Sequence, residues 1–242
     1  MKTSDNVINM EETMRDYQIR VDVDQILTCQ GADPDSLRWR RPDIIRMTEE
    51  ALAREWNLVS PVLLSRYYAV SSFNDGILFL EGGGTLEGPV ITQNLAVAEA
   101  VVVMIGTVGP DIDRRISESF SEKPSYALAV DGLGTASADA LRNAAASAIK
   151  EEAESQGWKL SRYCSPGMLG WEILEGQRQV FSLLDGGKIG VDLMFSGQMN
   201  PQKSISGVLG MGSRVEQPTG PPCQFCSSRK TCLFKDRYKE KS

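Results

Sequence analysis

Three of the five cysteines in this chain lie within ten residues of one another near its C-terminal end. Cys223, Cys226 and Cys232 follow the pattern C-x2-C-x5-C, directly after a segment rich in proline and glycine. Two cysteines separated by two residues can turn both sulfurs toward one point, which suits a tetrahedral metal ion about 2.3 Å from each sulfur. A reducing cytoplasm disfavours disulfides, so the spacing predicts a metal site.

The fourth ligand of such a site has to come from elsewhere. The chain contains no histidine, so the candidates are Cys164, Cys29, a carboxylate, a water molecule or a partner's thiolate, and we take Cys164. An iron–sulfur cluster is favoured over zinc, because three neighbouring cysteines and one distant cysteine are a recurrent pattern for such clusters. Zinc would instead cross-link a tail too short to fold by itself. Free thiols on a solvated tail are the third alternative.

The composition restricts the remaining chemistry. Without histidine, Ser-His-Asp catalysis, His-ligated zinc and an imidazole base are excluded.

The net charge is −6, yet residues 223–242 carry six basic and two acidic side chains. The acidic body argues against a nucleic-acid partner, which requires a broad basic face. The longest apolar run has six residues, from Ala100 to Ile105, far short of the roughly 20 of a membrane helix. With no apolar leader at the N-terminus, we expect a cytoplasmic protein without membrane contact.

The patterning predicts one main body flanked by less regular segments. We expect a flexible N-terminus at 1–17, a body at 18–212, a linker at 213–222 and a Cys-rich metal-binding tail at 223–242. Apolar spacing predicts helices where it follows a helical period and strands where it alternates or is briefly continuous. The expected helices are 23–29, 42–52, 95–100, 110–120, 127–156 and 171–184, and the expected strands are 19–24, 63–70, 76–81, 101–107, 189–194 and 202–209.

Four motifs in order point to a known family. They are Ile105-Gly106-Thr107-Val108-Gly109, Ala129-Val130-Asp131-Gly132-Leu133-Gly134, Arg162-Tyr163-Cys164-Ser165-Pro166-Gly167, and Met199-Asn200-Pro201-Gln202-Lys203-Ser204-Ile205-Ser206-Gly207. Their combination resembles the activation (AdoMet-binding) domain of cobalamin-dependent methionine synthase, especially its free-standing relatives beside corrinoid methyltransferases. The resemblance covers about residues 20–212, and the C-terminal cysteine cluster is an addition to the family pattern.

The resemblance implies a fold and a function. The fold is α+β, a bent antiparallel sheet with flanking helices, here followed by the short Cys-rich tail. The domain would dock over a corrinoid and present AdoMet, and an electron would allow methyl transfer to cobalt. The protein supplies AdoMet and geometry while the cobalt performs the chemistry.

The resemblance also implies site residues. Arg162 would pair with the AdoMet carboxylate, as its forked guanidinium suits two oxygens. Ser165, Pro166 and Gly167 would form a tight turn against the ligand, and Ser204 and Ser206 would line the cofactor side of a strand. Two positions depart from the family pattern, since Met168 and Leu209 stand where an aromatic residue is frequent and lack its hydrogen-bonding phenol.

The expected function is an accessory module for reductive activation of a corrinoid protein or cobalamin-dependent methyltransferase, with AdoMet as ligand and an electron passed through the C-terminal cluster. One alternative is a non-catalytic binding or assembly protein that has lost AdoMet binding and holds a structural metal. A second is a stand-alone AdoMet-dependent methyltransferase. The first depends on the Ser165–Gly167 bend and the Lys203–Gly207 segment lying close together beside an open cleft.

Overall fold

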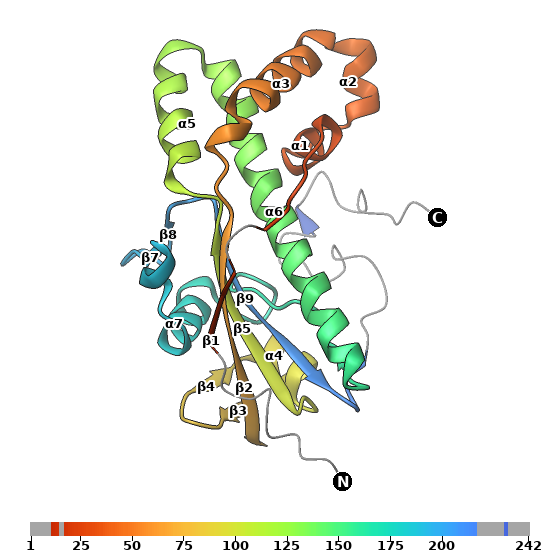
Figure 1. Ribbon diagram of the computed structural model, residues 1–242, viewed down its shortest axis with the longest axis vertical. Coiled ribbons are helices and arrows are strands. Elements are labelled where there is room, and N and C mark those ends of the chain that lie inside the picture. The colour runs from red at the N-terminus through yellow and green to blue at the C-terminus, as the bar shows by residue number, and fades with distance from the viewer. Residues whose placement is uncertain (1–10, 15–16, 217–229, 232–242) are drawn as a thin grey trace.

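The structure is a computed structural model, and it describes residues 11–14, 17–216 and 230–231. Helices and strands alternate irregularly along the chain, and long helices cluster in its middle (Figure 1). The helices are α1 (Val23–Cys29), α2 (Pro34–Arg40), α3 (Pro42–Glu55), α4 (Pro89–Leu95), α5 (Pro110–Glu122), α6 (Pro124–Ser155) and α7 (Ile173–Leu183), with 3-10 turns η1 (Trp56–Leu58) and η2 (Gly186–Ile189). The strands are β1 (Glu11–Met14), β2 (Val62–Asn74), β3 (Ile77–Leu80), β4 (Thr85–Glu87), β5 (Ala100–Thr107), β6 (Lys159–Leu160), β7 (Asp192–Leu193), β8 (Met199–Asn200) and β9 (Ser204–Gly212).

One antiparallel sheet organises the described part of the molecule. Its strand order is β4-β3-β2-β5-β9-β6, with β1 paired to β2 as well. Strand β5 lies at the centre between β2 and β9, and all eight of its residues are buried. A short, continuous apolar run is typical of such a fully covered strand, so the sequence prediction at 101–107 is confirmed.

The sheet bends along its longest strand. The first part of β2 pairs with β5, its last residues pair with β3, and the register shifts between Val70 and Ser72. A bulge of this kind adds a residue to one strand and increases the local twist. The β2–β3 turn uses positive φ at Asp75 (52°) and Gly76 (81°), as the Asn74-Asp75-Gly76 sequence predicts. The α+β class with a bent antiparallel sheet and flanking helices is confirmed.

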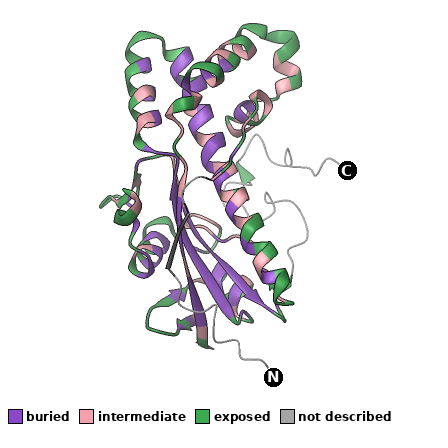
Figure 2. Cartoon of the chain, in the orientation of Figure 1, coloured by how far each residue is buried: buried purple, intermediate pink, exposed green. Residues whose placement is uncertain are grey.

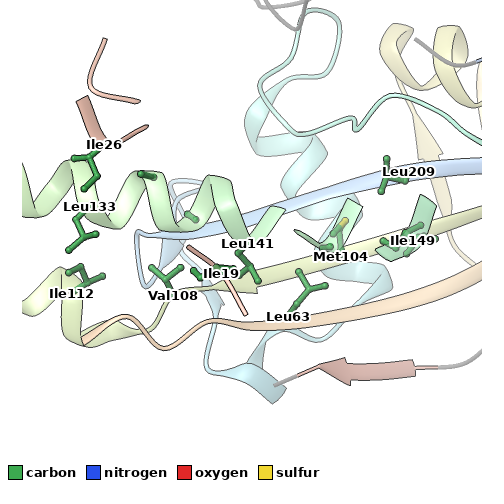
Figure 3. Packing of buried hydrophobic residues seen from close by; sticks show 14 of the residues in the cluster. Ile19, Ile26, Leu63, Met104, Val108, Ile112, Leu133, Leu141, Ile149 and Leu209 are labelled. Atoms are coloured by element: carbon green, nitrogen blue, oxygen red, sulfur yellow. The ribbon is translucent and has the colours of Figure 1, made fainter. Parts of the chain in front are cut away.

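Helix α6 covers one face of the sheet, and small residues let it approach closely. Its buried side includes alanines and glycines over most of its 32 residues. A Cβ at Gly132 would lie 2.5 Å from Cδ of Gln30 on α1, and one at Gly134 would lie 2.9 Å from Cγ of Lys203. In the larger core cluster, Leu141 of α6 lies over Leu63 of the sheet, and Leu133 of α6 lies beside Ile26 and Ile112 (Figure 3).

The opposite face of the sheet carries a second core beneath α4 and α7. Leu64, Val103 and Val208 of the sheet pack there with Ile91 of α4 and Val180 of α7. Figure 2 shows that buried residues concentrate along the central strands and the inner side of α6, whereas the outer sides of the helices are exposed. No helix among the described residues is long and apolar enough to cross a membrane.

Three predicted elements are wrong. Residues 19–22 are irregular rather than a strand, because Asp22 caps α1 reciprocally with Gln25, both hydrogen bonds being 2.8 Å. The helix expected at 95–100 is not formed. Helix α4 lies earlier in the chain, from Pro89 to Leu95, and residues 96–99 are not helical. The strand expected at 189–194 reduces to β7, because Gly190 adopts a left-handed conformation after η2. Helix α2 and the short strands β1, β4, β6 and β8 were not predicted.

Candidate functional site

The two segments that the sequence singled out lie side by side. Cys164 donates its backbone N–H to the carbonyl of Val208 (2.9 Å) and accepts one from Val208 (2.8 Å). Ser161 lies three residues before Cys164. Its N–H donates to the carbonyl of Gly210, two residues further along β9 (2.8 Å), and Gly210 N–H donates to Ser161 Oγ (2.8 Å). The loop therefore extends the sheet beyond β6. The expected proximity of the Ser-Pro-Gly bend to the Ser-x-Ser-Gly strand is confirmed, but the cavities at the start of β9 are not lined by the bend.

Gly207 makes this approach sterically feasible. A Cβ at this position would lie 2.5 Å from both the carbonyl oxygen of Cys164 and Cζ of Tyr163. The Tyr163 ring occupies the space above Gly207, with the guanidinium of Arg142 5.8 Å from its centroid. Burial raises the pKa of Tyr163 well above its ordinary range, so its phenol stays neutral.

The Ser-Pro-Gly bend is a compact turn held against α7. Met168 N–H donates to the Ser165 carbonyl (3.1 Å), and Ser165 N–H points at the Met168 sulfur (3.2 Å). Gly167 has φ of 93°, which favours glycine, and its N–H donates to the Trp171 carbonyl (2.8 Å). Pro166 packs against α7, since a Cβ at Gly176 would lie 3.0 Å from its Cβ. The backbone of the turn and the Met168 sulfur are thus used internally.

The two serines of β9 have different surroundings. Ser206 is buried, and its hydroxyl donates to Gln177 Oε1 on α7 (2.9 Å). Ser204 is half-buried, donates to the Pro201 carbonyl (2.7 Å), and lines a cavity. Of the predicted β9 residues, Ser204 is therefore the one that reaches open space, whereas the Ser206 hydroxyl already has a protein partner.

Two adjoining cavities lie between α1, α6 and the start of β9, and we call them together the α1–α6 cleft. Their volumes are about 430 and 260 Å³, and both are lined by Cys29 and Asp139. The larger volume falls within the range of about 300–1,000 Å³ that is usual for ligand pockets. The other polar lining residues are Asp22, Asp24, Gln25, Thr28, Asn143, Thr135, Arg142 and Ser204.

The charged residues that line the cleft are three aspartates, Asp22, Asp24 and Asp139, and one arginine, Arg142. Asp139 pairs with Arg142 one helical turn away (2.5 Å), and both side chains remain about a third exposed. Asp24 pairs with Arg38 of α2 (2.5 Å). Burial, followed by the negative charge of Asp139, raises the pKa of the Cys29 thiol, while Arg142 lowers it. The cleft therefore offers carboxylates for a cationic group and a guanidinium for an anionic one.

Lys203 fixes the cleft end of β9 to α6. Its Nζ donates to Asp131 (2.7 Å) and Thr135 (2.9 Å), and its side chain is only 14% exposed. The aliphatic part of the side chain lies on Gly134. This contact explains Gly134 and Asp131 of the predicted motif on α6, and it positions the next residue, Ser204, against the helix.

Arg162 and Cys164 belong to the loop rather than to this cleft. The Arg162 side chain is half-buried, and burial lowers the pKa of its guanidinium. The Cys164 thiol is fully buried and 3.5 Å from the Arg162 carbonyl, and burial raises its pKa to about 12. A metal ligand has to be a thiolate, and the buried Cys164 thiol holds its proton here, so the role of Cys164 as a fourth ligand stays a prediction. Its use as a fourth ligand requires the loop to open.

The cysteines of the C-terminal cluster, Cys223, Cys226 and Cys232, lie outside the described residues. Within the residues that the structure does describe, there is no group of three or more Cys, Asp or Glu side chains arranged to hold a metal ion.

Sequence reasoning missed most of the cleft. Cys29 and Asp139 come from helices that are far apart in the sequence, and neither belongs to a recognisable motif. The one available signal was the pair of glycines on α6, which indicates close contact with another element.

Comparison with known proteins identifies the fold. No protein-family model matches the chain, and no curated protein matches it in sequence. Among solved structures, it is similar to the MetH reactivation domain bound to AdoHcy, with a TM-score of 0.65 and 10% sequence identity, over 88% of this chain and 81% of that chain. The chain therefore has the reactivation-domain fold, the fold of the methionine synthase activation domain.

Proposed function

We propose that this protein is an AdoMet-binding accessory module that acts on a corrinoid protein or a cobalamin-dependent methyltransferase. The observation that carries the proposal is the combination of the reactivation-domain fold with an open, acidic α1–α6 cleft at the Ser-x-Ser-Gly strand. The solved structure with this fold is bound to AdoHcy, the product that AdoMet becomes when it gives up its methyl group.

The charge of the cleft matches the charge of AdoMet. AdoMet carries a sulfonium and an ammonium, both positive, and one carboxylate. Asp139 and Asp22 at the cleft suit the two cations, and the forked guanidinium of Arg142 suits the carboxylate. Ser204 supplies a hydroxyl oxygen at the β9 side. AdoMet provides the methyl group, while these residues bind and orient it toward a docked partner.

Arg162 remains the predicted partner of the AdoMet carboxylate, together with the turn formed by Ser165, Pro166, Gly167 and Met168. Burial already disfavours the charged form of the Arg162 guanidinium, and a bound carboxylate would compensate this cost. Arg162 is not among the residues that line the α1–α6 cleft, whereas Arg142 is. The roles of Arg142 and Arg162 are therefore separable by mutation.

The binding test compares two matched carboxylates. Asp139 lies at the cleft and pairs with Arg142 at i+3, and Asp111 on α5 pairs in the same way with Arg114 (2.9 Å). Calorimetric titration with AdoMet should show that Asp139→Asn weakens binding about tenfold, since an ionic hydrogen bond contributes about 1.5–3 kcal/mol, whereas Asp111→Asn leaves it unchanged. Equal affinities of the two variants, or no binding by the wild type, would refute the proposed cleft.

The electron-transfer part of the proposal rests on Cys223, Cys226 and Cys232. An iron–sulfur cluster there would supply one electron to the corrinoid of the partner. Anaerobically purified protein should contain iron and absorb broadly near 400 nm, and replacing the three cysteines by serine should abolish both signals. Stoichiometric zinc without iron would favour a structural metal site. A preparation that contains neither metal would eliminate the proposed electron transfer through the three cysteines.

One observation favours the alternative of a non-catalytic corrinoid-protein binding module. The Ser206 hydroxyl and the Met168 sulfur, both expected at the ligand, are occupied by Gln177 and by the turn itself. This alternative predicts complex formation with a cob(II)alamin-loaded corrinoid protein but no methylcobalamin spectrum after AdoMet and a reductant are added. The proposed function predicts that spectrum, and predicts its loss in Asp139→Asn.

A further inference from the structure

A second cavity lies on the other side of the molecule, and we call it the acidic groove. Its volume is about 860 Å³, and it is bounded by the β2–β3 turn, the end of β4, α4, the Gly170-Trp171 segment and the start of α7. Trp171 and Ile77 provide apolar wall, and all four ionisable residues of the lining are acidic: Asp75, Glu87, Glu172 and Glu175.

These four carboxylates differ from three aspartates on the helical side of the molecule. There, Asp24, Asp111 and Asp139 each pair with an arginine within 3 Å. The four groove carboxylates are all exposed, and none forms an ion pair with Lys or Arg in the described part of the chain. Unneutralised charges of one sign in a concave site attract a ligand of the opposite sign.

Gln179 adds an unused donor to the wall of the groove. Its Oε1 accepts hydrogen bonds from Glu87 N–H (3.0 Å) and from the Trp171 indole Nε1–H (3.4 Å). Because both neighbours are donors, the amide cannot be turned the other way round. Its Nε2 is left without a hydrogen-bond partner although the residue is only 8% exposed. A buried donor without a partner is costly, and this amide nitrogen lies inside the wall, beneath the surface that a ligand in the groove would touch.

An apolar surface continues from the groove over the neighbouring segments. Leu169 (68% exposed), Ile173, Leu174, Met194 and Phe195 (95% exposed) make up half of the large hydrophobic residues that are exposed in the described chain. The turn carrying Met194 and Phe195 packs on α7, because a Cβ at Gly197 would lie 3.2 Å from Leu174 Cδ1. Contiguous exposed apolar side chains of this kind mark interaction surfaces.

We propose that the acidic groove and this apolar surface together bind a basic segment of a partner protein that carries lysine or arginine beside large apolar side chains. The cations would face Glu87, Glu172 and Glu175, and the apolar side chains would cover Phe195 and Leu169. This inference is independent of AdoMet binding, since the α1–α6 cleft and the groove have no lining residue in common.

The probe is a fluorescein-labelled peptide of alternating lysine and leucine, with a glutamate–leucine peptide as its counterpart. Fluorescence anisotropy with the full-length protein should show binding of the lysine peptide that weakens as salt increases. The triple variant Glu87→Gln, Glu172→Gln, Glu175→Gln should weaken it about tenfold or more. The substitution Phe195→Ser should weaken binding of the lysine peptide at all salt concentrations, because the substitution removes apolar contact rather than charge.

The matched control removes the same charge elsewhere. Glu49, Glu122 and Glu151 are exposed residues of α3, α5 and α6, and their triple Gln variant should bind the peptide like the wild type. Equal weakening by both triple variants would mean attraction to the overall negative charge and would overturn the proposal. So would equal binding of the glutamate peptide, or displacement of the lysine peptide by AdoMet.

A residue-level measurement completes the test. The chain has four tryptophans, and only Trp171 lines the groove. In an NMR spectrum of indole N–H groups, the lysine peptide should shift the Trp171 signal, assigned with Trp171→Phe, and leave that of exposed Trp39 unchanged. A peptide that binds without shifting the Trp171 signal would contradict the assigned site.

Discussion

Cys164 and Val208 exchange two backbone hydrogen bonds, and this pairing joins the loop after β6 to strand β9. The loop is therefore part of the sheet rather than a free connection. The Ser-Pro-Gly turn that follows is fixed on one side by β9 and on the other by α7 through Pro166 and Gly176. The geometry of the candidate site thus depends on sheet pairing as well as on local turn chemistry.

Replacing Gly207 by alanine should disrupt this pairing. The added Cβ would lie 2.5 Å from the backbone oxygen of Cys164 and from the Tyr163 ring, and excess volume in a packed site costs about 1–3 kcal/mol. Thermal or urea unfolding should show a corresponding loss of stability. Gly187→Ala is the control, because its Cβ would approach only the flexible carboxylate of Asp185. Equal stability of the two variants would contradict the described packing.

Tyr126 should make the stability of the protein depend on pH above 10. Its hydroxyl donates to Glu55 Oε1 (2.8 Å), and burial, followed by this hydrogen bond, raises the pKa of Tyr126 to about 12. An unfolded tyrosine titrates near 10, so the folded state holds its proton more tightly. The stabilisation is complete below pH 10 and is lost as the pH rises toward 12.

Urea unfolding of the wild type and Tyr126→Phe over that pH range measures this contribution. The wild type should lose more stability than the variant between pH 10 and 12, because the variant has no phenol to ionise. Parallel losses in the two proteins would show that Tyr126 is not the responsible group.

The thiols of Cys29 and Cys164, the two cysteines that the structure describes, should react with iodoacetamide at very different rates. Cys29 is half-buried at the α1–α6 cleft, whereas Cys164 is fully buried with a pKa of about 12. Because the thiolate is the reactive form, iodoacetamide at pH 8 should modify Cys29 first, as measured by mass spectrometry of the digested protein. Rapid modification of Cys164 would indicate that the loop opens, which is the condition for its service as a metal ligand.

Much of the fold could be predicted from the sequence, because its main elements bury one regular face. Helix α5 and strand β5 follow their apolar periods, and the glycines of α6 indicate its close packing. Helix α2 escaped prediction because none of its residues is buried, so it has no apolar stripe. The proximity of the two loop and strand motifs was predictable from the resemblance, but the cleft was not, since tertiary packing alone brings Cys29 to Asp139.

Protection of Cys29 by AdoMet tests the central claim most directly, because it reports ligand binding and its location in one measurement. Cys29 lines both cavities of the α1–α6 cleft. Saturating AdoMet should slow the alkylation of Cys29 by iodoacetamide, because a ligand that fills the cleft excludes the reagent from the thiol. AdoHcy, which lacks the sulfonium charge, should protect at higher concentrations only. An unchanged Cys29 rate at millimolar AdoMet would contradict the account.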